Sequence, residues 1–145
     1  MPTPETRSIS CRIEDAVKAS FPSTTINSKT IAMHVIDDNS REKEDLYAVV
    51  ECRELTQIHP VLKDYSAVIE LTAISQIAED KTGGYCDALL KVLMAMFSGT
   101  ISKSNLSSAS SLAVDAVLPA DTGGASDDVF NIKTCTAKIY IQNAT

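Results

Sequence analysis

The longest β-strand signal in the chain covers residues 65–77, and it constrains the fold more than any other segment. Its odd-numbered positions are apolar over most of this length, and Val68 and Ile74 make the even-numbered side partly apolar as well. Successive side chains of a strand point to opposite faces of a sheet. A strand that is apolar on both faces is usually central or covered by a neighbour, so we expect 65–77 inside a sheet.

Shorter strand signals surround this segment. Residues 46–55 place Ala48 and Val50 on one face and charged residues on the other, which predicts a half-buried strand. A hairpin-like connection joins it to 65–77, and Pro60 excludes a regular ladder there. The remaining expected strands are 30–36, 112–118 and 129–142.

The last expected strand changes its apolar face along its length. Phe130 and Ile132 are even-numbered, whereas the later apolar positions are odd-numbered. This change predicts either a β-bulge near residues 133–134 or a hand-over between two pairing partners. Two other segments are expected to be irregular: a Ser-rich loop at 99–111 and a long turn at 119–128.

Two segments have helical periodicity, and the first is 4–21. Ile9, Ile13 and Val17 recur every four residues there and form a narrow apolar stripe, as in a helix that lies on a sheet. Thr3 and Pro4 supply a capping residue and a proline suited to the first turn.

The second helical segment, 84–97, is apolar on nearly every side. Its only charged residues are Asp87 and Lys91, which have the spacing of one helical ion pair. A helix that is apolar all round is buried all round, so its flank is covered either by loops of its own chain or by another subunit. The candidate subunit-interface residues from this helix and from 65–77 are Leu90, Met94, Phe97, Tyr65 and Ile69.

The order of these elements predicts an α+β fold, with a mainly antiparallel sheet of about four to five strands and two helices packed on one face. A chain of 145 residues has the usual size of one domain, so we expect a single domain over 1–145.

Composition excludes several classes of protein. The net charge is −6 and the basic residues are scattered, which argues against binding nucleic acid through its phosphates. No apolar run reaches the length of about 18 residues that would indicate a membrane-spanning helix. The N-terminus lacks the pattern of a secretory signal, so we expect folding in a cytosol. The four isolated cysteines are expected to be buried, reduced thiols: Cys11, Cys52, Cys86 and Cys135.

No catalytic, cofactor or metal site is indicated. The glycine pairs at 83–84 and 123–124 do not continue into a phosphate-binding loop. His34 and His59 have no nearby acid at a spacing that would orient a general base. The charged segment 37–45 lacks the glycine turn and terminal glutamate of a calcium loop, which favours a solvated loop. We therefore expect a protein that assembles with other proteins and is not an enzyme.

The order of elements and the texture of several segments resemble a known family, the tail terminator (tail completion) proteins of long-tailed bacteriophages. The resemblance covers roughly residues 8–143. An N-terminal helix is followed by strands, a further helix and a closing strand, and the segments that carry the likeness are AVV (48–50), AVIELTA (67–73), DALLKVL (87–93) and TAKIYI (136–141).

The resemblance implies a virion structural protein that forms a ring, hexameric in that family. Such a ring caps the growing tail tube, ends its polymerisation and presents a docking surface to the head connector. DNA passes through the lumen without specific binding. The implied partners are copies of the same chain, the tail-tube protein and the head–tail connector protein, and the implied location is the virion tail or neck after assembly in the host cytoplasm. Partner-docking candidates in the loops 37–45 and 119–128 are Asp37, Asp38, Arg41, Lys43, Asp121 and Asp127.

Two other interpretations stay open at this point. The chain could be a head-completion or connector protein of the same neck, which differs only in where it docks. It could also be a small ligand-binding or enzymatic α+β domain, which a pocket combining His34 or His59 with convergent acids would favour.

Overall fold

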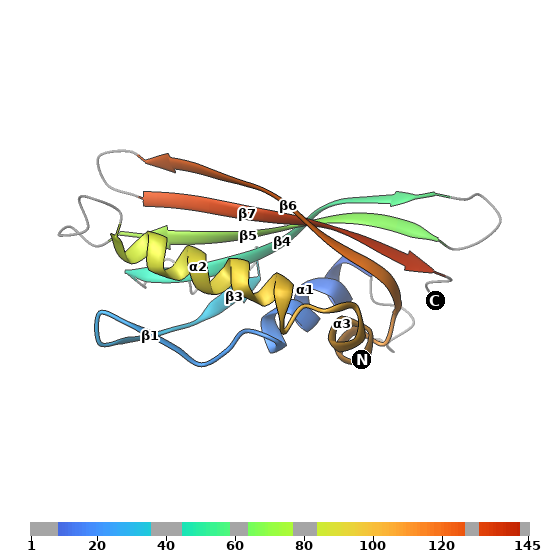
Figure 1. Ribbon diagram of the computed structural model, residues 1–145, viewed down its shortest axis with the longest axis horizontal. Coiled ribbons are helices and arrows are strands. Elements are labelled where there is room, and N and C mark those ends of the chain that lie inside the picture. Colours follow the sequence, from blue (N-terminus) through green and yellow to red (C-terminus); the bar gives the residue numbers. More distant parts are fainter. Residues whose placement is uncertain (1–8, 36–44, 59–63, 77–83, 127–130, 143–145) are drawn as a thin grey trace.

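The computed structural model describes residues 9–35, 45–58, 64–76, 84–126 and 131–142, with only the backbone described at 121 and 124–126 (Figure 1). The expected loop 37–45 lies outside these residues except for Asp45. The helices are α1 (Ile9–Ala19), α2 (Gly84–Ser98) and α3 (Lys103–Ser110). The strands are β1 (Thr24–Ile26), β2 (Lys29–Ile31), β3 (Met33–Val35), β4 (Leu46–Gln57), β5 (Tyr65–Ser75), β6 (Ala113–Ser126) and β7 (Asn131–Gln142).

The main sheet has the strand order β3-β4-β5-β7-β6 within the described part of the chain, and β1 and β2 form a separate two-stranded hairpin. All pairs in the main sheet are antiparallel except β3 with β4, which is parallel. The α+β class and the mainly antiparallel sheet are therefore confirmed. As expected from its two apolar faces, β5 is the central strand.

One face of the sheet carries the hydrophobic core. Ala48 and Val50 of β4 and Ile69 of β5 share this face by register, and they pack in a single cluster with residues of all three helices. Figure 1 shows α2 lying along the sheet, where it contacts β5 and β7, while α1 contacts β3, β4 and α3. The largest fully buried side chains are Ile13, Val17, Val50, Ile69, Leu71, Leu89, Leu93, Met96, Ile101, Leu106, Ile139 and Ile141.

The Ser-rich stretch expected to be a loop contains helix α3 instead. Ser102 caps its N-terminus, because the hydroxyl accepts a hydrogen bond from the Asn105 backbone N–H at 3.3 Å. The helix ends at Ser110, and the C-cap residue Ser111 adopts a left-handed conformation with φ of 60°. Leu106 anchors it in the core with no exposed surface. Serines in this segment therefore serve as a cap, as solvent-facing positions and, at the buried Ser110, as a hydrogen-bond donor to the Leu106 carbonyl.

Helix α3 is also tied to α1 by a charged side chain. The Arg12 guanidinium donates from Nε to the Ser110 carbonyl at 3.2 Å and from Nη2 to the Ser111 carbonyl at 2.9 Å. Carbonyls in the last turn of a helix lack intrahelical partners, and a cation there also interacts favourably with the helix dipole.

A turn was expected at 119–128, but strand β6 continues to Ser126, so the prediction is wrong for residues 119–126. Its pairing with β7 shifts register between Val114 and Ala116 and again between Pro119 and Thr122. Proline has no N–H to donate, so Pro119 fits an edge strand at such an irregularity.

The expected irregularity in the last strand is also wrong. Strand β7 pairs with β5 in one unbroken register, from Asn131 opposite Ser75 to Ile141 opposite Tyr65, and it pairs with β6 on its other side. Ile132 lies opposite Ile74, which in turn lies opposite Tyr47. The change of apolar face in the sequence therefore arises because apolar side chains form a row on the second face of the sheet. It does not arise from a bulge in β7.

Candidate functional site

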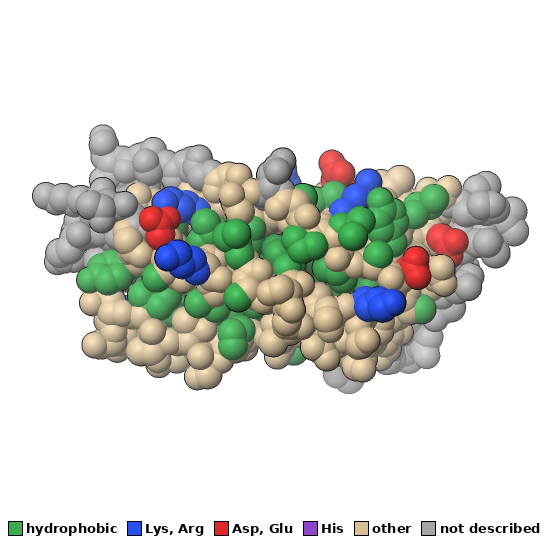
Figure 2. All heavy atoms as spheres, in the orientation of Figure 1, with side chains coloured by type: hydrophobic (Ala, Val, Ile, Leu, Met, Phe, Trp, Pro, Cys, Tyr) green, Lys and Arg blue, Asp and Glu red, His purple; other side chains and the backbone are tan. Residues whose placement is uncertain are grey.

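Helix α2 has one buried side and one exposed side. Leu89, Leu93 and Met96 face the core, whereas Met94 keeps 45% of its surface exposed and Leu90 is half-buried. The chain therefore covers the inner side of this apolar helix but leaves part of its outer side open. Figure 2 shows apolar side chains gathered along the middle of this face of the molecule, with charged side chains mostly toward its ends.

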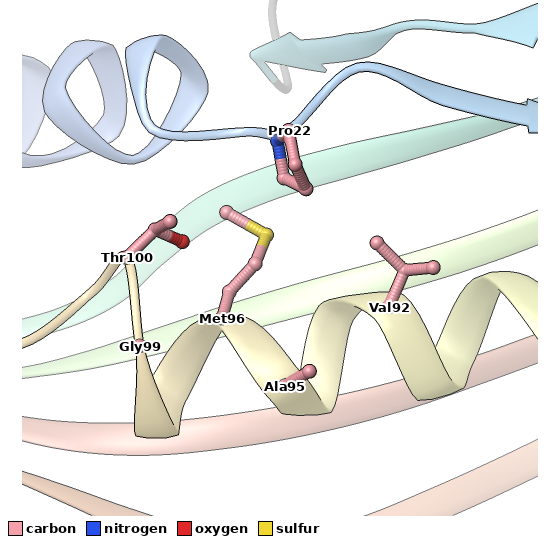
Figure 3. A pocket seen from close by; sticks show the side chains of 6 residues that line it. All are labelled: Pro22, Val92, Ala95, Met96, Gly99 and Thr100. Carbon is pink, nitrogen blue, oxygen red and sulfur yellow. The ribbon is translucent and has the colours of Figure 1, made fainter.

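A shallow apolar pocket lies beside this exposed side. It has a volume of about 270 Å³. Pro22 approaches it from the segment after α1, and the other side chains come from the C-terminal half of α2 and the residues that follow (Figure 3). The lining residues are Pro22, Val92, Ala95, Met96, Gly99 and Thr100. These residues, which belong to the described part of the chain, offer mainly apolar contact.

The five expected interface residues do not form one exposed patch. Ile69 has no exposed surface and Phe97 only 8%, so both pack inside the protomer, and their assignment to an interface is corrected. Both belong to the core face, where the sheet and α2 cover each other. Tyr65 and Leu90 are half-buried against the core, and only Met94 is largely exposed.

Two exposed apolar side chains at the end of β4 were missed by the sequence analysis. Leu55 is 37% exposed and Ile58 is 54% exposed. A register shift between Cys52 and Glu54 turns Leu55 onto the face that carries Ala67. The sequence could have indicated these exposed residues, because two large apolar residues stand next to a connection that contains proline.

The docking candidates in the loops are largely outside the described residues. Those outside are Asp37, Asp38, Arg41, Lys43 and Asp127. The backbone of Asp121 belongs to edge strand β6, so this residue is in a strand where a turn was expected.

The cysteines differ from one another in exposure, and the expectation of four buried thiols is corrected for Cys11, which is exposed on α1. Cys52 is half-buried, whereas Cys86 and Cys135 are buried, and none of the four is in a disulfide. Burial raises the pKa of Cys52 to about 11, with a further contribution from the Glu14 charge. Burial also raises the pKa of Cys135 to about 12. At neutral pH both thiols are protonated and are therefore poor nucleophiles.

The ion pair expected within α2 is replaced by a tertiary one. Asp87 pairs with Lys133 of β7, which fixes the first turn of α2 to the sheet. His34 is buried on the second face of the sheet, edge-on to Tyr47 with 6.0 Å between ring centroids, and His59 lies outside the described residues. Among the residues that the structure describes, no group of three or more His, Cys, Asp or Glu side chains is placed to hold a metal ion.

Within the described ranges, no single helix is long and apolar enough to cross a membrane. Helices α2 and α3 meet that criterion only when they are taken together, and they are bent by 90° at the break between them.

The sequence matches no known protein-family model, and it has no significant match among curated proteins.

The exposed apolar side of α2 with its pocket is the strongest functional candidate on the described surface, and it is a surface suited to protein contact.

Proposed function

We propose that this chain is a virion structural protein that assembles into a ring at the end of a phage tail tube, as a tail terminator. The ring ends polymerisation of the tube and provides the docking surface for the head connector. The order of elements and the texture of the strands and of α2 support the proposal, because they resemble that family along most of the chain.

The observation that carries the proposal is the outer side of α2. Met94 is largely exposed, and the adjoining pocket is lined by apolar side chains of Val92, Ala95 and Met96. Covering apolar surface contributes about 25 cal/mol for each Å² removed from water, so a second subunit gains stability by seating there. A surface of this kind on a small domain supports self-association.

The overall charge supports passage of DNA through a ring lumen without binding. At a net charge of −6, the chain repels phosphates on average. Of the described basic residues, Lys29, Arg53 and Lys133 pair with acids of the same chain. These pairs leave fewer cations to hold a phosphate backbone.

Native mass spectrometry and negative-stain electron microscopy of the purified full chain test the proposal. We expect a closed ring, and we expect added ring to stop elongation of the tail-tube protein encoded in the same genome. A strictly monomeric protein at tens of micromolar, with no ring even beside tail-tube protein, would contradict it. A ring that binds the connector but leaves tube elongation unchanged would favour a head-completion or connector protein of the same neck.

A further inference from the structure

The last described residues of β4 and Ile58, which follows the strand, present two apolar side chains to solvent. We call this the β4 tip, formed by Glu54, Leu55 and Ile58. The Ile58 backbone N–H donates to the Asp64 carbonyl at 2.8 Å, which joins the two sides of the hairpin just beyond the last pair of the ladder. The backbone is therefore held in place where Leu55 and Ile58 are exposed.

The α2 pocket can receive such a side chain and matches it in chemistry. Its volume of about 270 Å³ lies below the range of about 300–1,000 Å³ that is typical of sites for small molecules. One branched aliphatic side chain fits the space, and Val92, Ala95 and Met96 offer it apolar contact. The occupant best suited to this pocket is therefore an apolar side chain of a protein.

The two surfaces carry opposite charges. Lys91 is exposed one turn before Ala95, on the same side of α2 as the pocket, and it is the only charged residue between Leu90 and Ser98. At the tip, Arg53 pairs with Glu70 at 3.0 Å, and the Glu54 carboxylate is exposed as a negative charge. The tip and the pocket therefore carry complementary charges.

We propose that the β4 tip of one copy docks on α2 of the next copy, with Ile58 seated in the pocket and Glu54 facing Lys91. This inference rests on the proposed function, because it assumes self-assembly. Figure 1 places α2 over one half of the sheet and the end of β4 at the other end. The two patches therefore belong to different parts of the chain, and the contact is head-to-tail, a kind that repeats and closes into a ring when the rotation allows.

A mixing experiment tests the head-to-tail contact directly. Ala95→Glu blocks the pocket and Ile58→Asp removes the apolar tip, and both positions are exposed, so we expect melting curves like that of the wild type. Each variant alone is expected to be monomeric by native mass spectrometry. Mixed in equal amounts, they are expected to form one-to-one dimers and nothing larger, because the mixture supplies one intact pocket and one intact tip. Leu118→Asp is the matched control, since Leu118 is similarly exposed on β6 and is expected to leave assembly unchanged.

A charge exchange provides a second, milder test. Lys91→Glu and Glu54→Lys are each expected to weaken assembly about tenfold, and the double variant is expected to restore it. Loss of assembly in Ala95→Glu but not in Ile58→Asp would overturn the inference in favour of another element seated on α2. A wild-type ring that neither variant disturbs would also overturn it while leaving the proposed function intact. A monomeric wild type would remove both.

Discussion

The Glu14 carboxylate accepts a hydrogen bond from the backbone N–H of Cys52, with 2.8 Å between Oε2 and N. The described part of β3 pairs with β4 only over Ala48–Val50, so Cys52 lies just past the end of that pairing. Glu14 is itself 9% exposed. A carboxylate of α1 thus takes the place that a neighbouring strand would occupy and holds the helix against the edge of β4.

The first prediction concerns this bond. Glu14→Ala leaves the Cys52 N–H without its acceptor and should lower the free energy of unfolding by about 1–3 kcal/mol, because a buried donor is left unsatisfied. Glu14→Gln keeps an acceptor oxygen and should cost less. Urea unfolding measures both, with the exposed Lys18→Ala on the same helix as the control. Equal stability of Glu14→Ala and wild type would show that water replaces the carboxylate at no cost.

The second prediction concerns Arg12. Replacement by Ala removes both donors from the carbonyls at the end of α3 and should destabilise the protein by about 1–3 kcal/mol. Replacement by Lys should recover only part of this loss, because an ammonium group lacks the two-pronged geometry of guanidinium. Hydrogen exchange followed by mass spectrometry should show faster exchange in α3 and unchanged exchange in β5. Uniform acceleration across the chain would contradict a local role for Arg12.

The third prediction separates core from surface. Ile69→Ala should destabilise the protein by about 2–5 kcal/mol, because it opens a cavity at a fully buried position. Met94→Asp should change stability by less than about 0.5 kcal/mol, because Met94 is exposed. On the proposed function, Met94→Asp should nonetheless reduce assembly. Thermal unfolding and native mass spectrometry on the same two samples distinguish these effects, and the opposite pattern would contradict the placement of both residues.

The fourth prediction concerns alkaline pH. The pKa of Cys52 is raised to about 11 and that of Cys135 to about 12, from an ordinary value of 9.0, chiefly by burial. Raised folded-state values mean that the unfolded chain loses these protons first. Their contribution to stability is therefore fully present below pH 9 and is lost as pH rises toward 11 and 12. Urea unfolding between pH 7 and 10.5 should show the decline, and Cys135→Ala should make it shallower. An unchanged slope in that variant would contradict the assignment.

The fifth prediction concerns the partner of Asp87. A double-mutant cycle of Asp87→Asn and Lys133→Met should give a coupling energy of about 0.2–1 kcal/mol, as expected for a partly exposed ion pair. The same cycle with Lys91→Met should give a coupling near zero. Coupling of Asp87 to Lys91 instead would show that the pair forms within the helix.

Sequence patterns were reliable where the signal is local. The alternation in β4 and β5, the stripe of α1 and the extent of α2 all follow from side-chain periods of two and about 3.6, which neighbours along the chain encode directly. The same patterns could not show which apolar residue is covered, because coverage depends on segments distant in the sequence. Ile69 and Met94 are both apolar members of strong elements, yet one is fully buried and the other is open to solvent.

The amino-acid sequence by itself determined the α+β class, the central position of β5 and an apolar excess on α2. The tertiary structure alone decided that Glu14 reaches Cys52, that a Ser-rich stretch closes into α3 around Leu106, and that a register shift at Cys52 and Glu54 precedes the apolar tip. Helical and strand periods arise from the backbone geometry of adjacent residues, so they can be read locally. Helix caps, hydrogen bonds at sheet edges and exposed surfaces are decided only when segments distant in the sequence meet. Their energies depend on contact partners that cannot be identified from neighbouring residues in the sequence.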